Sequence, residues 1–260
     1  MKFAQRFLFL LLLFGSHMTL GQSWELVQSV EVSDPEPLDN FGFSVAIHED
    51  ILISGAWAED HDPANEVSEA GATYLFKKQA DGSWLETQKW NSPNPESLGY
   101  FGSAVATNGE IVAVGAYNED YPASNFLNTG TVYLYDLDGD PTDTLLSILD
   151  PNPQNANYFG FSLAMFDTYL LVGACNDDED DLGQNVIEDA GAAYLFQILP
   201  DQSIQLVQKF VASDRAEDDE FGRHLDMTED RIIISAPNKN HDPTFQFQVG
   251  AAYIFERQGD

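Results

Sequence analysis

Apolar residues in this chain fall into short runs of five to seven positions, separated by polar turns and acidic loops. The runs are rich in Val, Ile, Tyr and Phe and are bounded by Gly, Asp and Asn, which predicts β-strands. Outside the N-terminus, no segment keeps a helical apolar period over three turns. The pattern therefore predicts an all-β fold.

The runs recur in a fixed order. A first run opens with Phe-Gly, and a second closes on Gly-Ala or Ser-Ala. A third contains Ala-x-Tyr or Thr-x-Tyr followed by an apolar pair, and a long acidic loop separates it from the second. Four copies begin near residues 41, 101, 159 and 221. A fixed period of this length indicates repeated supersecondary units in an array or ring.

A fourth run follows the first three copies, at 83–90, 143–150 and 203–213. Its equivalent for the last copy lies at the front of the chain, because Leu26-Val27-Gln28 repeats Leu206-Val207-Gln208. We therefore predict a β-propeller of four blades with four strands each, closed by residues 23–33 as the last strand of the last blade. This strand count favours a monomer, and a dimer that forms a larger ring is the alternative.

The repeated Phe-Gly … Gly-Ala-Pro pattern resembles the FG-GAP repeat of integrin α-subunit propellers, in its bacterial-type variant. The resemblance covers roughly residues 22–260, although only the fourth copy has the proline, in Ser235-Ala236-Pro237. It implies a propeller with a role in binding or adhesion. The family's Ca²⁺ loop between the first and second strands is not implied here, because that turn is only about three residues long.

The N-terminus and the charge bear on localisation and partners. Residues 1–21 combine Lys2 and Arg6 with an apolar run, as in a secretory signal peptide. We expect 22–260 to form one propeller domain that is secreted, extracellular or periplasmic, without membrane insertion. A formal charge of −32 disfavours nucleic acid as a partner. Cys175 is the single cysteine, which excludes an intramolecular disulfide.

Acidic loops follow the second run of each copy, on the face where blade connections also emerge. Carboxylate oxygens suit Ca²⁺, so Ca²⁺ binding by Asp60, Asp120, Asp178 and Asp180 is one hypothesis, and a solvated acidic rim is the alternative. The two His-Asp-Pro sequences at His61 and His241 suggest either a transition-metal site or loop-organising turns. Tyr121 lies at a loop tip, which favours ligand contact, with packing under its own loop as the alternative.

The first run of the fourth copy departs from the others. It carries His224 and Asp226 where the other copies have Ser or Ala on the same strand face. First strands line the axis of a propeller, so this pair is expected at the channel, as ligand-binding residues or as a structural pair that fills a gap.

These observations lead to one main functional hypothesis and two alternatives. The main one is a secreted, non-enzymatic binding or adhesion module that presents its acidic loops to a protein or carbohydrate, with or without Ca²⁺. The first alternative is an enzyme acting on polysaccharide with carboxylates at the channel mouth. The second is a structural ring within a larger assembly. No catalytic motif is visible in the sequence.

Overall fold

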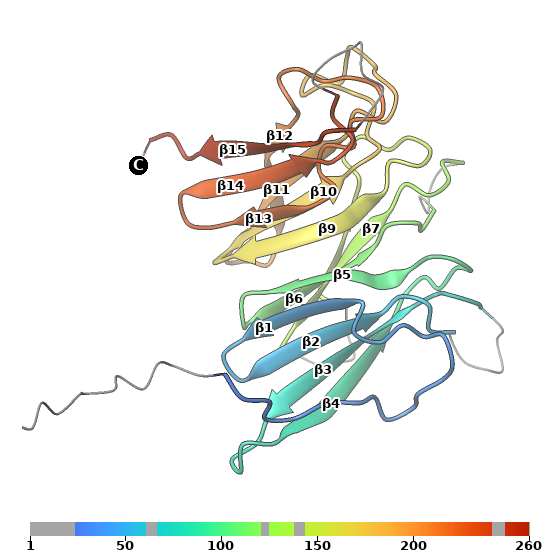
Figure 1. Cartoon of the computed structure of the whole chain (residues 1–260), viewed down its shortest axis with the longest axis vertical. Helices are drawn as coiled ribbons and strands as arrows, with labels where there is room; N and C mark the ends of the chain where they lie inside the picture. Colours follow the sequence, from blue (N-terminus) through green and yellow to red (C-terminus); the bar gives the residue numbers. More distant parts are fainter. Residues whose placement is uncertain (1–23, 61–66, 121–124, 138–143, 241–247, 260) are drawn as a thin grey trace, which may run out of the picture.

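The structure is a computed structural model that describes residues 24–60, 67–120, 125–137, 144–240 and 248–259. It consists of antiparallel sheets, each of which is one propeller blade, and the described residues contain no helix (Figure 1). The strands are, in blade 1, β1 (Ser44–His48), β2 (Ile51–Ala56), β3 (Ala72–Lys78) and β4 (Trp84–Asn91); in blade 2, β5 (Phe101–Thr107), β6 (Ile111–Ala116), β7 (Thr131–Asp136) and β8 (Leu146–Leu149); in blade 3, β9 (Phe159–Phe166), β10 (Tyr169–Ala174), β11 (Ala192–Ile198) and β12 (Ile204–Phe210); and in blade 4, β13 (Leu225–Met227), β14 (Arg231–Ala236) and β15 (Ala251–Glu256). The prediction of four propeller blades is confirmed.

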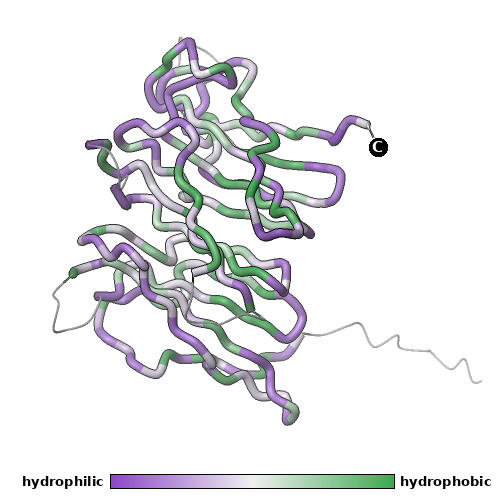
Figure 2. The backbone as a smooth tube through the Cα atoms, turned by 180° about the vertical axis from the view of Figure 1, so that it is seen from behind, coloured by the Kyte–Doolittle hydropathy of each residue, from purple (hydrophilic) through white to green (hydrophobic). Residues whose placement is uncertain are grey.

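The blades pack in sequence order through their first strands. β1 lies against β5, β5 against β9, and β9 against β13. We call the side of a blade that faces the next blade in sequence its front face, and the opposite side its back face. In blade 4, the front face is the side equivalent to the front faces of blades 1 to 3. Blade 1 and blade 4 lie at opposite ends of the molecule (Figure 1), and the view from behind shows the same order with hydrophobic strands and hydrophilic loops (Figure 2). The described residues thus form an arc of four blades.

Glycine explains how closely the blades approach one another. A Cβ on Gly55, in the Gly-Ala pair of blade 1, would lie 1.9 Å from the carbonyl oxygen of Gly102, in the Phe-Gly pair of blade 2. Gly115 and Gly173 make the same approach to the next Phe-Gly pair, at 2.2 and 2.1 Å. Only a residue without a side chain fits there. The repeated Phe-Gly and Gly-Ala pairs are therefore the two halves of one inter-blade contact.

Apolar clusters fill the spaces between blades. Ile53 and Leu75 on the front face of blade 1 pack against Val112 and Tyr135 of blade 2. Similar clusters join blade 2 to blade 3 and blade 3 to blade 4. The two outer faces of the arc are more exposed. On blade 1, Val45 and Ile47 are 69% and 67% exposed, and on blade 4, Ile254 is 67% exposed.

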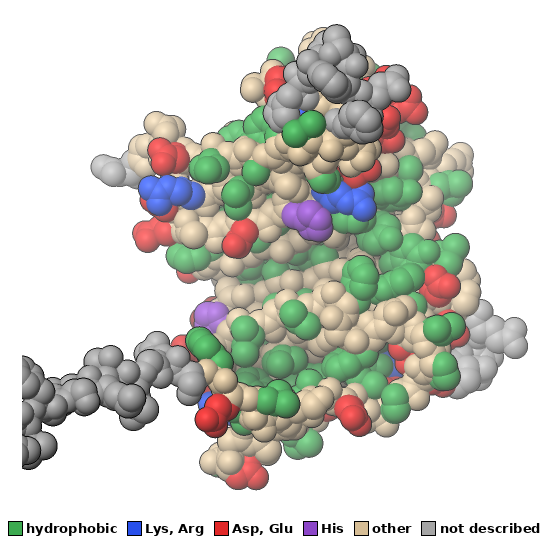
Figure 3. Space-filling view, in the orientation of Figure 1, with side chains coloured by type: hydrophobic (Ala, Val, Ile, Leu, Met, Phe, Trp, Pro, Cys, Tyr) green, Lys and Arg blue, Asp and Glu red, His purple; other side chains and the backbone are tan. Residues whose placement is uncertain are grey.

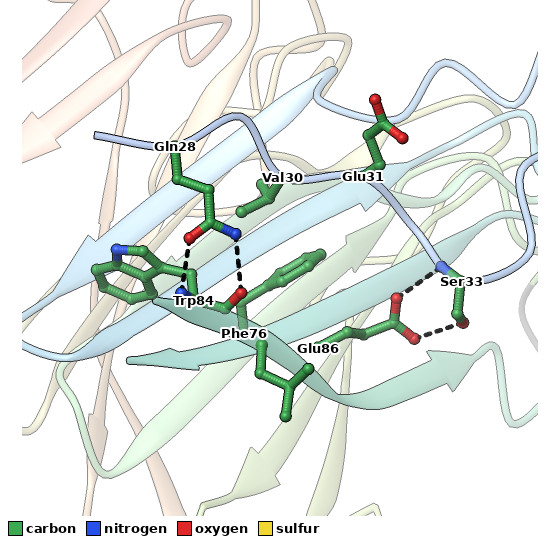
Figure 4. A pocket seen from close by; sticks show the side chains of 8 residues that line it. Gln28, Val30, Glu31, Ser33, Phe76, Trp84 and Glu86 are labelled. Atoms are coloured by element: carbon green, nitrogen blue, oxygen red, sulfur yellow. Dashed lines mark hydrogen bonds between the residues drawn. The ribbon is translucent and has the colours of Figure 1, made fainter. Parts of the chain in front are cut away.

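The predicted closing strand is not found in blade 4. Residues 24–33 form no strand and lie on blade 1, where Val30 and Val32 pack on its back face. The Gln28 side chain donates to the Trp84 carbonyl at 3.0 Å and accepts from its amide at 2.8 Å, and Ser33 Oγ donates to Glu86 at 2.8 Å (Figure 4). The short connection to Phe41 keeps the segment beside its own blade. The prediction that this segment closes the ring is therefore wrong for this arrangement.

Residues 1–23, which include the predicted signal peptide, lie outside the described residues. Within the described ranges, no helix has the length and apolarity needed to cross a membrane.

Candidate functional site

A buried polar side chain ties down the base of each acidic loop. It is the third residue after the Gly-Ala or Ser-Ala pair, namely Glu59, Glu119, Asp177 and Lys239, all at most 8% exposed. In every blade its carbonyl accepts from the glycine that precedes the third strand, at 2.9 Å. This contact closes the loop, so the acidic loops project from a fixed base on one end of the blades.

The charges of these buried residues are balanced differently in each blade. Lys89 pairs with Glu59 in blade 1, and Lys209 pairs with Asp177 at 2.9 Å in blade 3. Blade 4 reverses the polarity, since Lys239 pairs there with Asp219 at 2.8 Å.

In blade 2, none of the described residues forms such an ion pair with Glu119. The carboxylate accepts hydrogen bonds from the hydroxyls of Tyr133, at 2.6 Å, and Ser92. Burial raises the pKa of Glu119 to about 8, although these two hydrogen bonds act in the opposite direction. Glu119 is thus mostly protonated at neutral pH.

The loop carboxylates predicted to bind Ca²⁺ each organise their own loop. Asp60, Asp120 and Asp178 accept from a backbone amide on the far side of the loop, at 2.8, 2.9 and 2.7 Å. Asp180 is 8% exposed and accepts from the amides of Leu182 and Gln184 at 3.0 and 2.8 Å. Among the described residues, no group of three or more His, Cys, Asp or Glu side chains is placed to hold a metal ion.

Three other predicted site residues, His61, His241 and Tyr121, lie outside the described ranges. His224 and Asp226 are described, and both are exposed. Asp226 Oδ1 accepts from the Met227 amide at 2.8 Å.

The strand face that carries His224 and Asp226 is not a channel face, contrary to our expectation. Ser44 and Ser162, at the position of His224, donate to glycine carbonyls of the following blade at 2.7 Å. The pair therefore lies on the front face of blade 4, because this side of a first strand points to the neighbouring blade.

A row of aromatic side chains crosses the end of the blades from which the acidic loops emerge. We call it the aromatic row, and it consists of Phe43, Trp57, Tyr100, Tyr117, Tyr158 and Phe161. From Phe43 to Tyr117, successive ring centroids are 4.8 to 5.8 Å apart, and Tyr117 contacts both Tyr158 and Phe161, at 5.4 and 4.9 Å. Arg223 of blade 4 continues the row, 5.0 Å from the Phe161 ring. In Figure 3, hydrophobic side chains gather on the side of these loops, beside a Lys or Arg side chain.

Several members of the aromatic row have an uncommon backbone conformation, an unpaired polar atom or a shifted pKa. Tyr100 and Tyr158 have φ of +57° and +56°, in a turn that recurs before each Phe-Gly pair. This left-handed conformation costs about 1 to 2 kcal/mol for a residue with a side chain. The indole nitrogen of Trp57 is buried, and none of the described residues accepts its hydrogen bond. Burial raises the pKa of Tyr117 to about 12, so its hydroxyl stays a neutral donor.

Sequence reasoning missed the aromatic row. Trp57 and Tyr117 follow Gly-Ala, while Tyr100 and Tyr158 precede Phe-Gly, so the row is spread over three repeats. Aligning the copies shows that these positions hold Cys175 and Pro237, or Asn40 and Glu220, in other blades. The signal that could have revealed the row is an aromatic residue directly after Gly-Ala or directly before Phe-Gly, at positions where the residue type differs between copies.

Comparison with known proteins assigns the family. The FG-GAP repeat family matches the chain four times, over residues 24–76, 84–135, 147–196 and 205–255, and the chain therefore belongs to the FG-GAP repeat family. No curated protein matches it. Among solved structures, it is similar to the glutaminyl cyclase of Myxococcus xanthus, with a TM-score of 0.41 and 10% identity. That match covers 77% of this chain and 63% of the length of the cyclase.

Proposed function

We propose that this chain is a secreted, non-enzymatic binding module. The ligand that binds its loop face is a carbohydrate, and a protein ligand is the alternative. The observation that carries the proposal is the aromatic row, in contact with acidic loops. Aromatic rings offer apolar faces to the C–H groups of a sugar, while Tyr hydroxyls offer hydrogen bonds. The secreted part of the proposal rests on residues 1–21, whose sequence resembles a signal peptide.

The charge of the chain narrows the class of ligand. A formal charge of −32 repels sulfated or uronate-rich polymers, so neutral or cationic oligosaccharides fit best. Ca²⁺ binding by the acidic loops stays part of the proposal, as a means of bridging a sugar hydroxyl to a loop carboxylate.

A glycan array followed by calorimetry tests the proposal. We expect neutral or cationic oligosaccharides to bind, and Tyr117→Ala to weaken binding at least tenfold. Phe166→Ala is the matched control, since Phe166 is 39% exposed and lies at the turn between β9 and β10, at the opposite end of the blade. Equal binding by both variants, or an array without hits, would contradict a carbohydrate site on the aromatic row.

An enzyme acting on polysaccharide is the second candidate, because Glu119 is a carboxylic acid with a raised pKa, as a general acid requires. Its side chain is 0% exposed, however, so a substrate would reach it only after the loop had opened. A hydrolysis assay on every array hit distinguishes the two candidates. Turnover that Glu119→Gln abolishes would replace the binding-module proposal with the enzyme.

A further inference from the structure

Blade 4 has a sheet edge without a strand beside it. The other blades have four strands, whereas among the described residues β15 is the last strand of a three-stranded sheet. A groove of about 940 Å³ runs beside β15, between blades 3 and 4. Val207, Phe210 and Phe255 contribute apolar side chains to it. An open edge next to an apolar groove is a template for an added strand.

Residues 24–30 have the sequence of a strand but no sheet. Trp24, Leu26 and Val27 are 100%, 88% and 82% exposed. The family matches beginning at 84, 147 and 205 each start at or within a fourth strand, and the first match starts at 24 in the same way. The segment is held on blade 1 chiefly through side chains, which leaves its own backbone without a ladder.

We propose that residues 24–30 of one copy of this chain add to β15 of a second copy as its fourth strand, and that the exchange is reciprocal. A second copy is the occupant because residues 24–33 lie on blade 1, at the end of the molecule opposite to blade 4 (Figure 1). Reciprocal exchange gives a closed dimer with twofold symmetry, in which both edges are covered.

The repeat sets the register of the added strand. In blade 3, Gln208 lies opposite Leu195 and Leu206 lies opposite Phe196. By equivalence, Gln28 lies opposite Ile254 and Leu26 opposite Phe255. Phe196 and Ile204 point toward blade 2, so Leu26 and Trp24 point into the groove between blades 3 and 4. The exposed apolar side chains of the segment thus meet the apolar lining of the groove.

The front face of blade 4 explains why a strand is exchanged and a further blade is not stacked. Ser235 stands where Gly55, Gly115 and Gly173 admit the carbonyl of the following blade. Its Oγ accepts from the His224 amide at 3.0 Å. Asp226 stands where the first strands of blades 1 to 3 have alanine. Both residues prevent the close contact that joins blades within the arc, whereas the edge of β15 is unaffected.

Complementation between two variants tests the exchange. The segment variant carries Trp24→Asp and Leu26→Asp, and the groove variant carries Phe166→Asp and Val207→Asp; Phe166 and Val207 line the groove. By light scattering at micromolar concentration, we expect the parent chain at twice the chain mass and each variant at the chain mass. An equimolar mixture should form a heterodimer through its one intact interface.

The matched control carries Leu182→Asp and Val186→Asp, two residues that are 73% and 68% exposed in the acidic loop of blade 3. It adds the same charge and should remain a dimer. A monomeric parent chain, or a mixture that stays monomeric, would overturn the proposal.

A disulfide reports the exchange without destabilising variants. Gln28→Cys combined with Ile254→Cys should give a covalent dimer on a non-reducing gel after oxidation with glutathione disulfide. Gln28→Cys combined with Leu182→Cys should stay unlinked. Linkage within one chain would show that the segment closes its own ring and would overturn the second copy as the occupant, and so would no linkage at all.

Discussion

Glu119 shows how one missing cation changes a repeated site. The equivalent residues Glu59 and Asp177 face a lysine on the fourth strand of their blade. In blade 2 the residue opposite Tyr133 is Ser147, which cannot supply a charge. Burial without a cation therefore decides the protonation state of Glu119.

The first prediction concerns the pH dependence of stability. The pKa of Glu119 is about 8 in the folded state and near 4.5 in the unfolded state. Between these values the folded state binds more protons, so the free energy of unfolding falls as pH rises, by up to about 1.4 kcal/mol per pH unit. Glu119→Gln stays neutral and should remove this part of the decline. Urea unfolding from pH 5 to 9 measures it.

Glu110→Gln is the control, because Glu110 is exposed in the turn before β6. Its curve should run parallel to that of the parent chain. Burial also raises the pKa of Asp150 to about 6, but Asp150 is present in all three proteins and cancels in the comparison. A parallel curve for Glu119→Gln would mean that Glu119 is ionised when folded.

The second prediction concerns the buried ion pair of blade 3. Lys209→Met leaves the carboxylate of Asp177, which is 0% exposed, without its cation. We expect a loss of about 3 kcal/mol or more in denaturant unfolding. Lys78→Met, which breaks an exposed pair with Asp50, should cost less than about 1 kcal/mol. Adding Asp177→Asn to Lys209→Met should recover part of the loss, and no recovery would contradict the ion-pair explanation.

At this scale the sequence predicts where acidic residues gather but not what each does. Asp60 and Glu59 are neighbours in one loop, yet Glu59 is buried against Lys89 while Asp60 holds a backbone amide. Their roles depend on which side of the loop base each side chain occupies. That choice is set by packing against the third and fourth strands, which the local sequence does not encode.

At the scale of elements, the glycine pairs control the spacing of the blades. A Cβ on Gly115 would lie 2.2 Å from the carbonyl oxygen of Gly160, which belongs to the backbone and cannot rotate away. Gly115→Ala should therefore push blades 2 and 3 apart and cost about 3 kcal/mol of stability. Gly82→Ala is the control, since Gly82 has φ of +88° and no atom within 4 Å of the added Cβ.

Thermal and denaturant unfolding measure both glycine variants. Gly82→Ala should lose only the cost of the left-handed backbone, about 1 to 2 kcal/mol. Equal losses in the two variants would show that the blades can adjust to the added methyl group.

The strands themselves were predictable because turn residues and apolar runs repeat in every copy. The position of residues 24–33 was not. Their sequence matches the fourth strands of the other blades, yet they form no strand in this structure. Pairing depends on which sheet edge lies within reach, and blade 1 is nearer than blade 4. The aromatic row escaped prediction for a related reason, since its members come together only when successive blades are stacked.

At the scale of the whole molecule, blades 2 and 3 have a neighbouring blade on both faces, whereas blade 4 has one on a single face and the back face of blade 1 is covered only by the N-terminal segment. β6 and β10 are almost fully buried, whereas β14 and β15 alternate between buried or half-buried and exposed positions. In a linear array each repeat is stabilised mainly by its neighbours, so opening begins at the ends.

Hydrogen exchange at high dilution should therefore find the slowest amides in β6 and β10 and the fastest among the strands in β15. Raising the protein concentration should slow exchange along β15, because an added strand from a second copy would bond to the amides on its outer edge. The amides of β6 should change little, which makes them the internal reference. Equal protection of all four blades at high dilution would instead indicate a ring that is closed within one chain, since blade 4 would then be covered on both faces as blades 2 and 3 are.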